Sequence, residues 1–159
     1  MFINEALTKL KNLKSKATRT EIYINECAVY YEDDHPEHVY SEEMLIRNSI
    51  NEEIIKLKAN IQNTNAVTLV NYKNQTITLS ELILRNAQLR IEMAFVTHQM
   101  THSNNERNPY ASRTKDNIKK VLALGCDKAI FKKQLDELEK EKEEIERVMA
   151  LVNSSTSLV

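Results

Sequence analysis

The chain has 159 residues, one glycine, two prolines and a net charge of −1. Sheet-rich folds need more turn glycine than one residue supplies, so this composition favours long helices and excludes a β-sandwich or a doubly wound sheet. The small net charge supplies no global field that would draw the protein to DNA, RNA or an acidic membrane, so nucleic acid and membrane are not expected partners.

The first predicted helix runs from about residue 4 to 31. Apolar and small residues recur every three or four positions from Ile3 to Tyr31, which marks one face of a long helix. At 1.5 Å per residue this helix would be about 40 Å long, so it needs partner helices beside it. The polar run 32–38, which contains Pro36, predicts a loop.

A second helix is predicted to start at Ser41, whose hydroxyl suits an N-cap, with Glu42 and Glu43 in the first turn. Its apolar stripe consists of Ile46, Ile50, Ile54, Leu57 and Ile61. We expect it to end near 63–65, because asparagine tolerates the left-handed conformation at a helix end.

Residues 66–79 predict a short β-hairpin. The runs 67–70 and 76–79 are rich in β-branched residues, and Asn74 between them is a plausible left-handed turn residue. Two strands alone are only marginally stable, so the hairpin has to pack on the helices or pair with a second subunit.

The third predicted helix begins at the capping box formed by Thr78 to Glu81, with Ile77 and Leu82 at the spacing of a hydrophobic staple. One apolar stripe contains Leu82, Leu89, Met93, Val96 and Met100, and it is widened by Ile83, Ala87, Ile91 and Ala94. Because this apolar face is broad, we expect the third helix to be the most buried.

The last part of the chain predicts a long loop, a fourth helix and a tail. Residues 103–117 lack periodicity and contain Pro109, while 118–124 fits either a strand or a short helix. The fourth helix is predicted from its cap Asp127 to about residue 153, with Lys142 interrupting the apolar stripe. Residues 154–159 read as a flexible, frayed tail.

Together these elements predict an all-α fold: a single helical domain over 1–159, built as a long-helix, antiparallel, coiled-coil-like bundle of four main helices with a small β-hairpin. The helices at 4–31 and 127–153 are too long for an ordinary globule of this size. Their apolar stripes need extra cover, so we predict a homo-oligomer.

Two elements of the chain carry a family resemblance. The segments Ile61-Gln62-Asn63-Thr64-Asn65 and Thr78-Leu79-Ser80-Glu81-Leu82, with the opening Asn4-Glu5-Ala6-Leu7, resemble the septicolysin-like family of small bacterial and phage proteins. Gln62 stands where that family usually has Asn, and Asn74 lies near its usual turn Gly. The resemblance covers nearly the whole chain. It implies a helical fold and an oligomer, and it implies no established activity.

Two groups of residues contain side chains of the types that bind metal ions. His98 and His102 stand four residues apart, the spacing that clamps zinc on a helix face, but Gln99 occupies the place of the general-base Glu of zinc peptidases. Polar histidines near a helix end are the alternative. A second cluster contains Asp33, Asp34, His35, Glu37 and His38, and a solvated acidic loop is its simpler interpretation. We predict no metal, no cofactor and no enzyme.

The long loop carries the predicted ligand site, because its residues combine guanidinium groups, hydroxyls and one aromatic ring that suit a phosphate-bearing anion. The same sequence resembles the Tyr-Ser-Arg-Ser segment of the septicolysin-like family at residues 110–115. Loop packing on a neighbouring subunit and protein docking are the alternatives. The predicted ligand-binding residues are Arg107, Tyr110, Arg113 and Lys115, with Arg85 and Arg90 of the third helix as second contributors.

A basic run, Lys9, Lys11, Lys14, Lys16 and Arg19, scatters around the helix axis and does not form a phosphate-tracking stripe. Cys27 and Cys126 each lack a nearby second cysteine, which favours free thiols in a reducing compartment. With no signal-peptide pattern at Met1–Glu5 and no apolar run of roughly 20 residues, we expect a cytoplasmic protein.

Three functional hypotheses follow. The first is a non-enzymatic helical oligomer that binds or sequesters a small anionic ligand, in a phage setting a nucleotide signal of a host defence system. The second is a coiled-coil structural or adaptor protein that binds a partner protein through its helix faces. The third is a metal-dependent enzyme that uses His98 and His102.

Overall fold

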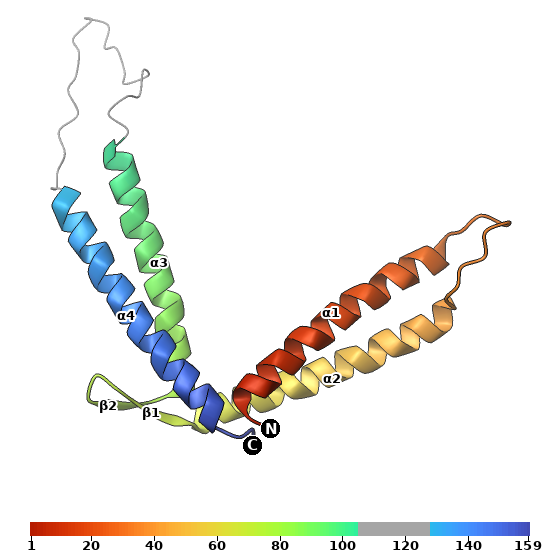
Figure 1. Ribbon diagram of the computed structural model, residues 1–159, viewed down its shortest axis with the longest axis horizontal. Coiled ribbons are helices and arrows are strands. Elements are labelled where there is room, and N and C mark those ends of the chain that lie inside the picture. The colour runs from red at the N-terminus through yellow and green to blue at the C-terminus, as the bar shows by residue number, and fades with distance from the viewer. Residues whose placement is uncertain (105–127) are drawn as a thin grey trace, which may run out of the picture. The chain divides into compact units, whose positions relative to one another are not determined.

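The structure, a computed structural model, describes residues 1–104 and 128–159 (Figure 1). In chain order its elements are α1 (Ile3–Ala28), α2 (Tyr40–Val67), β1 (Leu69–Tyr72), β2 (Gln75–Thr78), α3 (Leu79–Asn104) and α4 (Lys128–Ser155). This order confirms the predicted fold class of four main helices with a small β-hairpin. None of the described helices is long and apolar enough to span a membrane.

The chain divides into two compact units, and the single domain expected from the sequence stays a prediction. The first contains Met1–Ser80 and Met149–Val159, and the second contains Glu81–Val148. Each unit is described by itself below.

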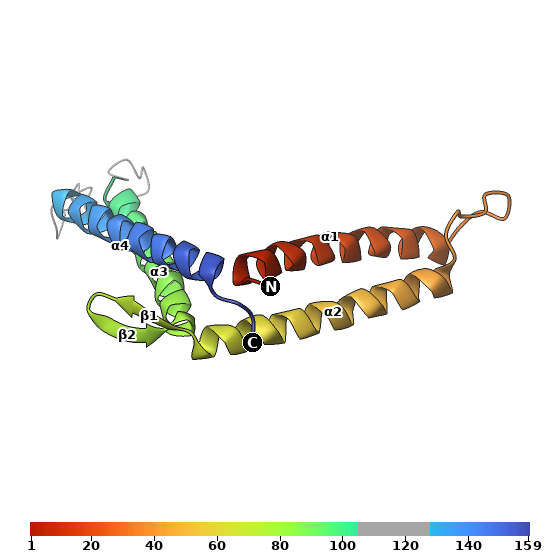
Figure 2. The same ribbon diagram turned by 60° about the horizontal axis from the view of Figure 1, so that its bottom comes forward.

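In the first unit, α1 and α2 run antiparallel side by side (Figures 1 and 2). Their buried positions recur every seven residues, at Ala6, Leu13, Thr20 and Cys27 on α1 and at Glu43, Ile50, Leu57 and Thr64 on α2. A seven-residue repeat keeps one narrow seam of a helix turned toward its neighbour. Ion pairs flank this seam, because Lys9 Nζ lies 2.6 Å from Glu53 Oε1 and Arg47 Nη2 lies 3.1 Å from Glu21 Oε1.

The α1–α2 seam is apolar at one end and polar at the other. Its apolar core consists of Ala6, Leu13, Ile50, Leu57 and Ile61, with Leu10, Ala17, Ile54 and Leu158 packed against it. Toward the connection between the helices the buried residues are Thr20, Cys27 and Glu43. The end of the helix pair next to the α1–α2 connection therefore buries polar groups, and these need hydrogen-bond partners.

The hairpin lies inside its predicted range. β1 and β2 pair antiparallel with Leu69 opposite Thr78 and Tyr72 opposite Gln75. The two turn residues Lys73 and Asn74 have φ values of 47° and 62°, as a tight hairpin turn requires. Val70 and Tyr72 are buried, and β2 contacts α2. The prediction of Asn74 as a left-handed residue is confirmed.

The helix ends differ from the predictions by a few residues. α1 ends at Ala28 rather than about 31, and α2 continues to Val67 rather than ending near 63–65. The longer α2 is closed by Thr68, whose backbone N–H donates to the carbonyl oxygen of Thr64 at 2.9 Å. Ser103 and Asn104, predicted to open the long loop, are the last residues of α3.

In the second unit, α3 and α4 lie side by side (Figure 1). The buried residues of α3 in this unit include Leu82, Leu89 and Val96, again seven residues apart, and Ile145 is fully buried on α4. The prediction that the third helix is the most buried is wrong in part. Four residues that widened its predicted apolar face are exposed, namely Ile83, Ala87, Ile91 and Ala94. α3 therefore buries one apolar stripe, and these four residues lie outside it.

The predicted frayed tail is instead bonded to the N-terminus. Ser154 and Ser155 form the end of α4, and Ser157 pairs with Phe2 in an antiparallel bridge. The Ile3 N–H donates to the Thr156 carbonyl oxygen at 3.0 Å. The first turn of a helix has N–H groups without intrahelical partners, so the tail satisfies a donor that α1 leaves open.

Candidate functional site

The predicted ligand site divides into a part outside the structure and a part within it. Arg107, Tyr110, Arg113 and Lys115 lie outside the described residues, as do 118–124 and Asp127. Arg85 and Arg90 lie on α3 and are described.

Both described arginines face carboxylates of α4. Arg85 Nε lies 3.5 Å from Glu141 Oε1 and Arg90 Nη2 lies 3.2 Å from Glu146 Oε1. The side chains of these arginines are 49% and 63% exposed, so each pair contributes little to stability. An anionic ligand would nevertheless have to displace a carboxylate from each guanidinium.

The histidine pair of α3 is only partly described. His98 is exposed near the end of the helix, and the side chain of His102 lies outside the described residues. In the described parts of the chain, 1–104 and 128–159, no three His, Cys, Asp or Glu side chains converge on a point that could hold a metal ion. That holds for the described acidic cluster at 33–38 as well.

At the end of the α1–α2 pair, His38 is held by three contacts. Its Nδ1 lies 3.0 Å from Glu43 Oε1, and its ring stacks on Tyr23 with centroids 4.1 Å apart. The Sγ of Cys27 donates to the His38 carbonyl oxygen at 3.0 Å. The buried Glu43 thus receives a donor from a residue five positions earlier in the chain.

Cys27 is a donor in this arrangement and not a nucleophile. Burial raises the pKa of its thiol, and the neighbouring carboxylates of Glu43 and Glu26 raise the pKa further. The thiolate is the reactive form of cysteine. The site therefore keeps Cys27 protonated, as a hydrogen-bond donor to the connection between α1 and α2.

A cavity of about 490 Å³ opens beside His38, and we call it the tip cavity. It is lined by residues of the end of α1 and of the connection to α2, among them Tyr23, Glu26, Tyr30, Tyr31, Asp34 and Glu37. The acidic cluster at 33–38 predicted a solvated loop, and the sequence pattern did not predict this cavity. Its sequence signal is the group of tyrosines immediately before the acidic run.

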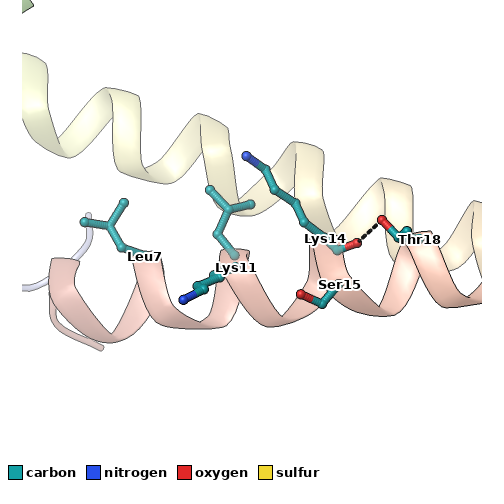
Figure 3. Close-up of a pocket in the computed structure, with 6 residues that line it drawn as sticks. Leu7, Lys11, Lys14, Ser15 and Thr18 are labelled. Atoms are coloured by element: carbon teal, nitrogen blue, oxygen red, sulfur yellow. Dashed lines mark hydrogen bonds between the residues drawn. The ribbon is translucent and has the colours of Figure 1, made fainter.

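Part of the basic run lines a hollow on α1 (Figure 3). Lys11, Lys14, Ser15 and Thr18 line it, and Thr18 Oγ1 donates to the Lys14 carbonyl oxygen at 3.2 Å. Every lining residue belongs to α1. A ligand there would meet side chains from one helix only, which does not make an enclosing site.

α3 also carries an exposed apolar face, and Ala87, Ile91 and Ala94 of this face were predicted to widen the buried stripe. Leu84, Ile91 and Phe95 are 69%, 62% and 63% exposed. Each of Leu84 and Ile91 follows a buried leucine by two positions, which turns it by about 200° around the helix axis. Exposed Ala87 lies between Leu84 and Ile91, and exposed Ala94 lies between Ile91 and Phe95. We call these five residues the outer seam of α3.

The comparisons with known proteins concern family and fold. The profile of a family described as "Family of unknown function (DUF6847)" matches residues 8–158. No curated protein matches the chain. A crystal structure of a functionally unknown conserved protein from Corynebacterium diphtheriae is similar, with a TM-score of 0.84, 18% identity, and coverage of 100% of this chain and 99% of that one. This likeness shows the fold alone, and the resemblance to septicolysin-like proteins stays a prediction.

Proposed function

The chain belongs to a family of unknown function, DUF6847, and we propose that it acts without catalysis, as a self-associating helical binding protein. A second copy docks on the outer seam of α3. The observation that carries the proposal is the exposure of Leu84, Ile91 and Phe95, each more than 60% exposed, on one helix face. Apolar side chains that recur every three, four or seven positions on an exposed helix are typical of helix-docking surfaces.

The seam suits a second copy of itself. It holds no charged residue, so two copies meet without like-charge repulsion, and Ala87 and Ala94 let two helix backbones approach closely. In an antiparallel pairing about the centre of the seam, Leu84 of one protomer lies opposite Phe95 of its partner. Such a two-fold contact uses the same patch on both copies and closes the assembly at a dimer.

The energy of this contact supports a reversible dimer. Full burial of one large apolar side chain is worth roughly 1.5–3 kcal/mol, so burying the exposed part of three side chains on each of two copies gains roughly 6–12 kcal/mol. Association costs roughly 4–15 kcal/mol in lost translational and rotational freedom. Dissociation near micromolar concentrations needs a net gain of about 8 kcal/mol, which corresponds to the favourable ends of the two ranges, and we expect the dimer there.

Analytical ultracentrifugation from about 1 to 100 μM, a range that brackets micromolar affinity, tests the proposal. The wild-type protein should shift from monomer to dimer across this range, and Ile91→Glu should remain a monomer. Leu45→Glu is the matched control, because Leu45 is 70% exposed on α2 and lies outside the seam. A wild-type protein that stays monomeric, or an Ile91→Glu variant that dimerises like Leu45→Glu, refutes the proposal.

The described residues favour this binding of a protein over the binding of an anion. The only described members of the predicted anion site, Arg85 and Arg90, each have a carboxylate of α4 beside the guanidinium. Sequestration of a nucleotide signal stays a prediction that rests on Arg107, Tyr110, Arg113 and Lys115. A thermal-shift screen with nucleotides and cyclic nucleotides, repeated on Arg113→Ala, tests it, since a ligand that binds only the folded state raises the melting temperature.

A further inference from the structure

The tip cavity lies where α1 ends and the chain turns back toward α2, away from the outer seam of α3 in the sequence. Its volume of about 490 Å³ is that of a site for a side chain or a small molecule rather than for a single water or ion. Three tyrosines line it, and Tyr30 and Tyr31 are 52% and 83% exposed. Their rings are available to a ligand that enters from solvent.

The charges around the cavity have one sign. Glu26, Asp34 and Glu37 line it, and no lysine or arginine is among its described lining residues. Within residues 1–104 and 128–159, none of these three carboxylates has an ion-pair partner. Three unpaired carboxylates around one cavity repel each other, and a bound cation would relieve that repulsion.

The floor of the cavity is held in place before any ligand arrives. His38 is fixed by the Glu43 carboxylate, by the ring of Tyr23 and by the Cys27 thiol. These contacts tie the connection to both helices, so little conformational freedom remains to be lost on binding. Preorganisation of this kind raises affinity, because the ordering cost has already been met in folding.

We propose that the tip cavity binds the guanidinium group of an arginine in a peptide segment of a partner protein. A guanidinium stacks on tyrosine rings and donates in pairs to carboxylates, and the cavity supplies both kinds of group. A peptide rather than free arginine is the ligand because the cavity lining also includes exposed apolar surface. Val29 and Tyr31, both more than 80% exposed, give the residues beside the arginine a surface to contact.

The proposal is tested by titrating ¹⁵N-labelled protein with acetyl-Gly-Arg-Gly-amide and following backbone amide shifts. Shifts should concentrate in residues 23–38 and saturate with a dissociation constant on the order of 1 mM. The matched peptide acetyl-Gly-Gln-Gly-amide should give no saturating shifts, and free arginine amide should bind more weakly than the arginine peptide. Equal binding of the Gln peptide, or of free arginine amide, overturns the proposal.

Variants then locate the site. The double variant Glu26→Gln/Glu37→Gln should bind the arginine peptide with about tenfold lower affinity, which corresponds to about 1.4 kcal/mol. Tyr31→Ala should lower the affinity as well. Glu52→Gln and Tyr40→Ala are the controls, because both residues are exposed and neither is among the lining residues. Unchanged affinity in the first set, or equal loss in the controls, would show that the peptide binds elsewhere.

The dimer proposal and the arginine-site proposal can be refuted independently of each other. The monomeric Ile91→Glu variant should bind the arginine peptide as the wild type does, because residue 91 lies on α3 and the cavity is lined only by residues 23–38. Affinity should fall as NaCl is raised, since screening weakens the carboxylate attraction. Loss of peptide binding in Ile91→Glu would overturn the assignment to the tip cavity and leave the dimer proposal standing.

Discussion

Thr64 connects the C-terminal residues to α2 by one side-chain hydroxyl. Its side chain is fully buried, Oγ1 donates to the Asn60 carbonyl oxygen at 2.8 Å, and it accepts the Val159 N–H at 3.0 Å. Thr64→Val keeps the β-branched shape and removes both bonds. A net hydrogen bond contributes about 0.5–1.5 kcal/mol, and the gain of one buried methyl group offsets part of the loss. We therefore expect the free energy of unfolding to fall by about 0.5–2 kcal/mol.

The matched control is Thr18→Val. Thr18 makes the same hydroxyl bond to the carbonyl four residues earlier, at 3.2 Å, on an exposed part of α1. Among the residues that the structure describes, no hydrogen bond joins it to the C-terminal residues. Its loss should change the free energy of unfolding by less than about 0.5 kcal/mol. Urea unfolding followed by circular dichroism measures both variants.

A second measurement reports on the tail itself. Carboxypeptidase should release Val159 faster from Thr64→Val than from wild type or Thr18→Val, because the last N–H has lost its partner. If Thr64→Val unfolds at the wild-type urea concentration and resists carboxypeptidase equally, then the bond to Val159 does not stabilise the tail and the reasoning is wrong.

Two further predictions concern buried polar groups. Asn86 is buried on α3 with its Oδ1 unpartnered, so Asn86→Leu should raise the free energy of unfolding by about 1–3 kcal/mol in urea; a loss of stability would show that the amide is satisfied in solution. Because burial and the nearby carboxylates raise the pKa of Cys27, iodoacetamide at pH 8 should alkylate it at least about tenfold more slowly than free cysteine. The reaction is followed by mass spectrometry in a Cys126→Ser background, and a rate equal to that of free cysteine contradicts the buried-donor assignment.

The sequence alone was sufficient for the fold class, because the signals that define it are local. Apolar residues every three or four positions predicted the four helices, and the β-branched runs around Asn74 predicted the hairpin. Boundaries were less secure: α2 continues past the asparagines at 63–65 because the hairpin that follows supplies its cap through Thr68. A helix end depends on what the next element offers its last carbonyl groups.

The candidate sites depended on contacts between residues distant in sequence. Periodicity predicted one broad apolar face on α3, and it could not show how much of that face a neighbouring helix covers; Leu82 and Leu89 are buried, whereas Leu84 and Ile91 are not. Charge alone suggested that Arg85 and Arg90 await an anion, and only the position of α4 revealed their carboxylate partners. Similarly, nothing local indicates that Cys27 and Glu43 meet at His38, or that Val159 reaches Thr64 across 95 positions. Local patterns determine which helices form, because helix formation depends on near neighbours; the use of each face is decided by the partner that packs on it.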